Sequence, residues 1–136
     1  MSDETSNGKR TPTVLVVDDN AQNLELLQVY MEALPDVRTI SATNGLEALE
    51  QVAQHHPDLI LLDIMMPKMS GFEVCKQLKS NPETRDIVVV MVTALNETGD
   101  VERASECGTD DYLTKPIDRH ALINLVKTYL AARTRR

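Results

Sequence analysis

The chain has 136 residues, of which 42% are hydrophobic and 26% are charged, a composition typical of one soluble globular domain. Its longest apolar run, residues 87–92, is far too short to cross a membrane, and its polar N-terminus lacks the apolar core of a secretory signal. The net charge is −7, and residues 13–130 carry −10, because residues 1–12 are neutral and the last six residues carry +3. Such an acidic body repels phosphate backbones, so no direct nucleic-acid binding and no membrane contact are expected.

Short apolar runs alternate with segments of helical spacing along the whole chain. The apolar runs predict five strands, at residues 13–17, 37–41, 58–62, 87–92 and 111–114. Apolar residues at helical spacing predict five helices, at residues 24–34, 46–56, 71–80, 101–107 and 119–130. Pro35 and Pro57 end the first two helices, and Ser70 stands at capping-box spacing before the third. The alternation predicts an α/β domain, a doubly wound parallel sheet with helices on both faces, in three layers.

The two ends of the chain fall outside this pattern. Residues 1–12 are polar and are expected to form a disordered tail, and residues 13–132 are expected to form the domain. The basic residues 133–136 are interpreted either as a solvated helix end or as the start of a linker.

Cys75 and Cys107 match neither a disulfide framework nor a metal-binding motif. They are therefore interpreted as small buried hydrophobic residues that stay reduced. Reduced cysteine is usual in cytoplasmic proteins, and we expect this protein to be cytoplasmic.

Four of the five predicted strands are followed directly by residues with useful chemistry. In chain order these are Asp18 and Asp19, then Asp63, then Thr93, and finally Lys115. The carboxyl ends of parallel strands meet at one edge of the sheet, which is where ligands of such sheets bind. We therefore expect these five side chains to form a single site.

Three carboxylates that crowd together repel one another and cannot all stay ionised without help. Mg²⁺ would relieve this repulsion, because it binds one or two carboxylates and keeps several waters. With a lysine and a hydroxyl added, the set suits phosphoryl transfer onto a carboxylate. For Asp18 and Asp19 the alternative is simple helix capping, since a helix follows them. That alternative is weaker for Asp63, because the next helix starts only after Ser70.

In their combination and order, four motifs resemble the receiver domains of two-component response regulators (CheY-like). The motifs are VLVVDDN at 14–20, DLILLDIMMPKMSGFEV at 58–74, VTA at 92–94 and DDYLTKP at 110–116. The resemblance covers about residues 13–132 and implies a flavodoxin-like fold with strand order 2-1-3-4-5. It also implies a signalling domain that catalyses only its own phosphorylation and dephosphorylation, rather than an enzyme with a separate substrate.

The resemblance implies a role for each acidic position. Asp63 would be the phosphoacceptor, and the donor would be a histidine kinase or a histidine phosphotransfer protein. Asp19, Asp63 and the backbone carbonyl of Met65 would bind Mg²⁺ directly. Asp18 would act on the ion through a metal-bound water.

The resemblance also implies how a signal leaves the site. Lys115 would pair with Asp63 and then with the phosphoryl group, to which Thr93 would donate a hydrogen bond. Tyr112 would rotate toward Thr93 as an aromatic switch, and the bond between Lys115 and Pro116 would be cis. The fourth helix, fifth strand and fifth helix would form the face that binds a downstream protein, an output domain or, in a homodimer, a second copy.

Three other functions compete with that of a receiver domain. A flavin or nucleotide site needs a Gly-, Ser- or Thr-rich phosphate loop, and the first strand is followed by Asp-Asp-Asn instead. An aspartyl phosphatase usually places its nucleophile and its acid two residues apart, whereas Asp18 and Asp19 are adjacent. A binding module that works without phosphorylation is the strongest rival, but it predicts the loss of a site residue, and none is lost.

Overall fold

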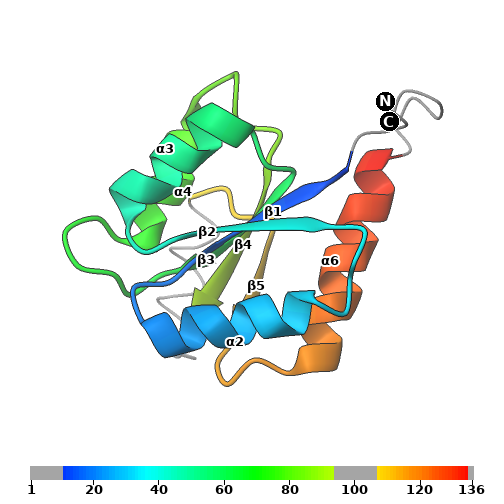
Figure 1. The fold of residues 1–136 in the computed structure, drawn as a ribbon. Coiled ribbons are helices and arrows are strands. Elements are labelled where there is room, and N and C mark those ends of the chain that lie inside the picture. Colours follow the sequence, from blue (N-terminus) through cyan, green and yellow to red (C-terminus); the bar gives the residue numbers. More distant parts are fainter. Residues whose placement is uncertain (1–10, 94–106, 135–136) are drawn as a thin grey trace.

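The structure is a computed structural model that describes residues 11–93 and 107–134 (Figure 1). Strands and helices alternate along the described chain. The strands are β1 (Thr13–Val17), β2 (Arg38–Ala42), β3 (Leu59–Asp63), β4 (Val88–Thr93) and β5 (Asp111–Thr114). The helices within the described ranges are α2 (Ala21–Met31), α3 (Gly45–His55), α4 (Gly71–Ser80) and α6 (Arg119–Thr134).

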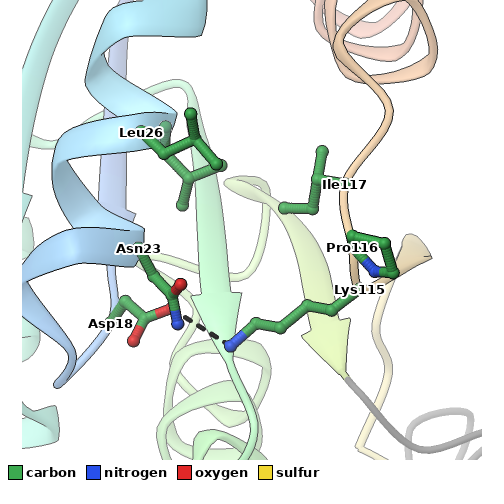
Figure 2. Close-up of a pocket in the computed structure, with 7 residues that line it drawn as sticks. Asp18, Asn23, Leu26, Lys115, Pro116 and Ile117 are labelled. Atoms are coloured by element: carbon green, nitrogen blue, oxygen red, sulfur yellow. Dashed lines mark hydrogen bonds and ion pairs between the residues drawn. The ribbon is translucent and has the colours of Figure 1, made fainter.

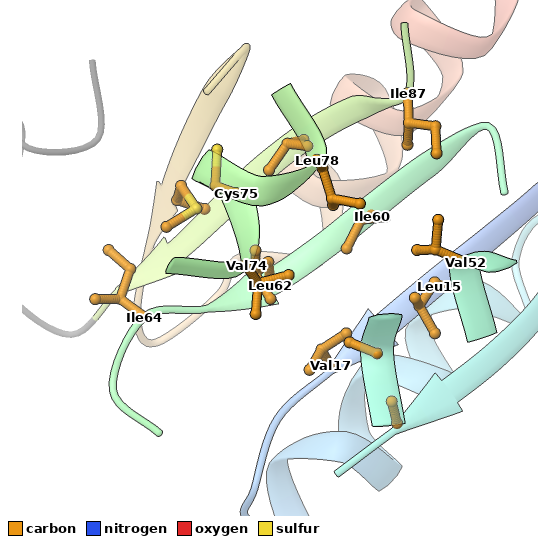
Figure 3. Packing of buried hydrophobic residues seen from close by; sticks show 14 of the residues in the cluster. Leu15, Val17, Val52, Ile60, Leu62, Ile64, Val74, Cys75, Leu78 and Ile87 are labelled. Atoms are coloured by element: carbon orange, nitrogen blue, oxygen red, sulfur yellow. The ribbon is translucent and has the colours of Figure 1, made fainter. Parts of the chain in front are cut away.

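The five strands form one parallel sheet in the order β2-β1-β3-β4-β5, which confirms the expected topology. β1, β3 and β4 are buried at every residue, because helices cover both faces of the sheet. On one face, α3 and α4 pack on a core that includes Leu15, Ile60 and Leu62 (Figure 3). On the other face, α2 and α6 pack on a second core around Val16 and Leu61. The three-layer architecture is therefore present.

Several boundaries differ from those expected from the sequence. The second, third and fourth strands each begin and end one residue later than predicted, so Asp63 and Thr93 are the last residues of β3 and β4. The first helix ends at Met31, earlier than the predicted end. The last helix continues to Thr134, past the expected end of the domain, because residues 131–134 contain no helix breaker.

Two expectations fall on residues that the structure does not describe. The helix expected at residues 101–107 lies outside the described ranges, except for Cys107, which is in a turn. The described part of the chain therefore holds four of the five expected helices. Of the expected disordered tail, only Thr11 and Pro12 are described.

Polar side chains cap the starts of the helices, as predicted for Ser70. The side chains of Asn20 and Asn44 cap α2 and α3, and Ser70 and Glu73 form a complete capping box at α4. Asp118 caps α6 by accepting a hydrogen bond from the Ala121 backbone. These caps fix where each helix leaves the edge of the sheet. No helix in the described part of the chain has the length and apolar character needed to cross a membrane.

Neither Cys75 nor Cys107 forms a disulfide bond. Burial raises the pKa of the Cys75 thiol to about 12, so this thiol stays protonated at neutral pH. Its sulfur lies 3.4 Å from the carbonyl oxygen of Cys107. Cys75 thus behaves as a small core residue, as the sequence indicated.

Candidate functional site

Three aspartates from two adjacent strands meet at the carboxyl edge of the sheet. Asp18 and Asp19 directly follow β1, and Asp63 ends β3, which is hydrogen-bonded to β1. One carboxylate oxygen from each residue lies within 4.8 Å of the other two. Asp18 and Asp63 are buried, whereas Asp19 is exposed. The three carboxylates therefore form a cluster that is open to solvent on the side of Asp19.

Lys115, which directly follows the edge strand β5, completes the cluster. Its ammonium nitrogen lies 3.2 Å from Asp18 Oδ2 and 3.4 Å from Asp63 Oδ1. The backbone N–H of Lys115 donates a 2.7 Å hydrogen bond to the carbonyl of Thr93, which anchors the lysine beside the end of β4. With all groups ionised, three carboxylates and one ammonium leave a formal charge of −2. One divalent cation would neutralise that charge, and hard carboxylate oxygens are the ligands that Mg²⁺ prefers.

The two buried aspartates are held in different ways. Asp18 is fixed through both oxygens, because the Asn20 backbone N–H donates a 2.9 Å hydrogen bond to Oδ1 while Lys115 binds Oδ2. Among the described residues, Asp63 Oδ1 accepts two long hydrogen bonds, both at 3.4 Å, from the Met65 backbone and from Lys115. Asp63 is thus the more loosely held carboxylate of the pair.

Burial raises the pKa of Asp63 from 3.8 to about 6, and the nearby charge of Asp18 is the second cause of this rise. Lys115 and the Met65 N–H act in the opposite direction and lower the pKa. Ionised Asp63 therefore destabilises the metal-free protein at neutral pH. A cation bound at the cluster would favour the ionised form.

This pKa predicts a pH-dependent gain in stability for Asp63→Asn without metal. Between pH 3.8 and about 6, the folded protein keeps a proton on Asp63 that the unfolded chain has already lost. The parent therefore loses stability as the pH rises through that window. We expect Asp63→Asn to raise the free energy of unfolding by ~3 kcal/mol at pH 7.5 and by much less at pH 4. Urea unfolding in EDTA, followed by circular dichroism, measures both values. An equal gain at both pH values would contradict this explanation.

The chain turns back sharply after Asp63, and Gly71 makes this possible. A Cβ atom placed at Gly71 would overlap the carbonyl oxygen of Asp63 and come within 2.9 Å of the Ile64 Cα. The Gly71 N–H also donates a 3.0 Å hydrogen bond to the Ile64 carbonyl. The sequence offered this glycine only as a motif match, and the structure gives its physical reason: α4 starts in contact with the backbone of β3.

Thr93 and Tyr112 lie on neighbouring strands. Thr93 is buried at the end of β4, and Tyr112 on β5 pairs in register with Met91, two residues before Thr93. The Tyr112 side chain is 43% exposed. The Lys115–Pro116 bond is cis, as expected. The strand pairing expected for these two residues is thus present.

The site has two contributors that our sequence reasoning did not assign to it. Asn20 was expected only near a helix start, but its backbone N–H also fixes Asp18. Asn23 lines a pocket beside Asp18 and Lys115 (Figure 2). Its position one helical turn after Asn20 was the only available signal, and it does not distinguish a site residue from a solvent-facing one.

Comparisons with known proteins agree with this geometry. The family model described as the response regulator receiver domain matches residues 14–127. A curated relative, the polar-differentiation response regulator DivK of Brucella ovis, is 44% identical over 120 residues, which cover 88% of this chain and 97% of the relative.

Solved structures agree as well. The signal receiver domain of a signal transduction histidine kinase from Syntrophus aciditrophicus has a TM-score of 0.85 and 36% identity, and the match covers 92% of this chain and 94% of that one. The BeF3-activated DrrB receiver domain has a TM-score of 0.80 and 27% identity, with 90% and 99% covered. Family match, relatives and strand-edge site lead to one assignment: the chain belongs to the response regulator receiver domains of two-component systems.

Proposed function

We propose that this receiver domain accepts a phosphoryl group on Asp63 from a phosphohistidine of a histidine kinase or phosphotransfer protein, in the cytoplasm. The observation that carries the proposal is the cluster of Asp18, Asp19 and Asp63, with Lys115 bound to two of its members. The DivK relative supports the response-regulator role.

The geometry supports a direct attack by Asp63. A carboxylate oxygen of Asp63 would form a bond to phosphorus while the bond between phosphorus and the donor's imidazole nitrogen breaks, and the imidazole would take up a proton from water. Lys115 lies within 3.4 Å of Asp63 Oδ1, so its ammonium can remain beside the charge that the phosphoryl oxygens bring. Asp18 would keep Lys115 in place, since its own position is fixed by the Asn20 N–H.

Mg²⁺ fits this site, because the available donors are carboxylate oxygens and the cluster is open on one side. Asp19 and Asp63 would hold the ion together with the Met65 carbonyl, and Asp18 would act through a bound water. When bound, the ion would neutralise negative charge on the incoming group.

A direct test uses acetyl phosphate, a small donor that needs no protein partner. With Mg²⁺ we expect the intact chain to gain the mass of one phosphoryl group, and with EDTA in place of Mg²⁺ we expect almost no gain. Electrospray mass spectrometry of the intact protein measures both. A chain that stays unmodified in Mg²⁺, yet remains folded, would instead favour a binding module that works without phosphorylation.

We further propose that phosphorylation acts on Thr93 and Tyr112. A phosphoryl group adds charge and acceptor oxygens close to the end of β4, where Thr93 is buried. Movement of Thr93 would leave space into which the exposed ring of Tyr112 on the neighbouring strand could turn. The face that includes β5 and α6 would then bind a downstream protein, an output domain or a second copy in a homodimer.

Beryllofluoride provides the test of this switch, since it is the activating group named for the DrrB receiver domain. With Mg²⁺ and beryllofluoride we expect amide chemical-shift changes to extend from the site through β5 to α6. In Tyr112→Ala we expect the changes in β5 and α6 to shrink while those around Asp63 persist. Shifts confined to the site loops in the parent protein would rule the switch out.

A further inference from the structure

Lys79, near the end of α4, uses every hydrogen-bond donor of its side chain within the protein. Its ammonium nitrogen lies 3.0 Å from the Arg85 carbonyl oxygen, 2.7 Å from that of Ile87 and 2.8 Å from Asp110 Oδ2. A lysine ammonium has three N–H donors, so these three partners saturate it. The Lys79 side chain is only 16% exposed, whereas lysine side chains are mostly exposed in folded proteins. Lys79 is thus a firmly fixed lysine outside the carboxylate cluster.

Asp110, the residue just before β5, joins the start of this strand to three other elements. The oxygen that binds Lys79 of α4 also accepts a 2.8 Å hydrogen bond from the Val89 backbone N–H of β4. The Asp110 N–H in turn donates a 2.9 Å hydrogen bond to the Val89 carbonyl. The Asp110 carbonyl accepts a 3.1 Å hydrogen bond from the Tyr129 hydroxyl of α6. The start of β5 is therefore held by α4, β4 and α6 together.

The opposite end of α4 touches the strand that carries Asp63. Gly71, the first residue of α4, has no room for a Cβ atom beside the Asp63 carbonyl oxygen, and its N–H donates a hydrogen bond to the Ile64 carbonyl. Between its two ends the helix packs on the first core through residues such as Val74 and Leu78 (Figure 3). Because a short helix keeps its length, a displacement at the Asp63 end would also move the end that is bound to β5.

We propose that the ion pair of Lys79 and Asp110 couples α4 to β5, so that a change at the carboxylate cluster reaches β5 by a second route, besides Thr93. The inference rests on the proposed function, because it concerns how phosphorylation of Asp63 acts on β5. Tyr112 follows Asp110 by only two positions, so a shift of Asp110 would change where the tyrosine ring stands. Lys79 is then a positioning residue, which acts on the switch without touching the reacting groups.

Stability alone is a poor explanation for this arrangement. A mostly buried lysine loses much of its hydration, and replacing a buried ion pair by apolar residues of similar volume is often neutral or stabilising. An apolar side chain, however, does not specify the distances between particular atoms of neighbouring segments. The three directed bonds of Lys79 do so, because they join α4 to the chain that enters β4 and to the start of β5. Fixing such a register is the best-attested use of a buried charged group.

The test measures how far the effect of beryllofluoride spreads through the protein when the pair is broken. Lys79→Met removes the ammonium and keeps an unbranched side chain. Asp110→Asn removes the charge but keeps an oxygen that can accept the hydrogen bond of the Val89 N–H. Lys76→Met is the matched control, because Lys76 is an exposed lysine on the same helix. Each isotope-labelled protein is titrated with Mg²⁺ and beryllofluoride while amide chemical shifts are recorded, and circular dichroism verifies that it is folded.

In the parent we expect the Val89 amide to shift on activation, because its N–H reports the position of the Asp110 carboxylate. In Lys79→Met the shift changes in β5 and α6 should fall about twofold or more, since residues that couple two sites change the coupling by roughly this factor. The changes around Asp63 should persist, and Lys76→Met should match the parent throughout. Asp110→Asn should weaken the same changes in β5 and α6. Combining it with Lys79→Met should cost no more than Lys79→Met alone, because both substitutions remove one interaction.

Undiminished changes in β5 and α6 of Lys79→Met would overturn the coupling, because the signal would then reach β5 without this pair. An equal loss in Lys76→Met would assign the effect to net charge, and additive losses in the double variant would mean that the two residues act separately. If Lys79→Met does not fold, Asp110→Asn decides, and undiminished changes in that variant overturn the coupling equally. A parent in which beryllofluoride changes only the site loops would reject the proposed switch itself, so the two failures are distinguishable.

Discussion

Asp63→Asn is expected to abolish phosphorylation of the chain by acetyl phosphate in the presence of Mg²⁺. An amide has no anionic oxygen to attack phosphorus, and neither of the other two carboxylates of the cluster has the same environment: Asp18 is tied down through both oxygens, and Asp19 is exposed. Intact-mass spectrometry of the parent and the variant, under identical conditions, measures the difference. The expected result is one phosphoryl group on the parent and none on Asp63→Asn.

Asp58→Asn is a close control for this experiment. Asp58 is also buried, at 6% exposed, and it stands just before β3, at the opposite end of the strand from Asp63. Its Oδ2 accepts a 2.8 Å hydrogen bond from the Thr13 backbone, a bond that the carbonyl oxygen of asparagine can also accept. We expect Asp58→Asn to be phosphorylated like the parent. Phosphorylation of Asp63→Asn to the same extent as the parent would show that Asp63 is not the acceptor.

Asp19→Ala is expected to weaken Mg²⁺ binding more than Asp18→Ala. Asp19 is the exposed member of the cluster and would touch the ion directly, whereas Asp18 is already bound to Lys115 and the Asn20 N–H. A residue that acts through a water typically contributes 10- to 100-fold to affinity, so we expect a loss of roughly that size for Asp18→Ala and a larger one for Asp19→Ala. The chain has no tryptophan, so amide chemical shifts in an NMR titration provide the readout.

Asp36→Ala serves as the control for the metal experiment, since Asp36 is an exposed aspartate in the connection between α2 and β2. It lowers the net negative charge by the same amount as the two test variants, so it measures the general electrostatic effect on Mg²⁺ affinity. We expect a change of less than about twofold, because exposed charges more than a Debye length from the ion are largely screened. If all three variants lost affinity equally, overall charge rather than the cluster would attract the ion.

The sequence alone was sufficient for the type and order of the elements. The runs at β1, β3 and β4 are apolar at nearly every position, and such runs form strands that are covered on both faces. Because parallel strands end at one edge, the residues after them could be assigned to one site before any coordinates were known. The helix starts were predictable too, since Ser70 and Asp118 bond to backbone only a few residues away. The predicted ends of three strands were wrong by one residue, because an apolar run does not show at which of two neighbouring residues the strand pairing stops.

Contacts between distant segments were decided only by the tertiary structure. Lys115 binds Asp18 as well as Asp63, across 97 and 52 residues of chain, and no local pattern records which of two aspartates a lysine will reach. The need for glycine at position 71 appears only when α4 is seen against the carbonyl of Asp63. The same holds for the pocket beside Asp18 and Lys115, because Leu26 and Ile117 line it together only when α2 and the β5–α6 connection pack at the same edge. Sequence periodicity specifies which residues of one element face inward, but the distances between elements depend on how all of them pack together.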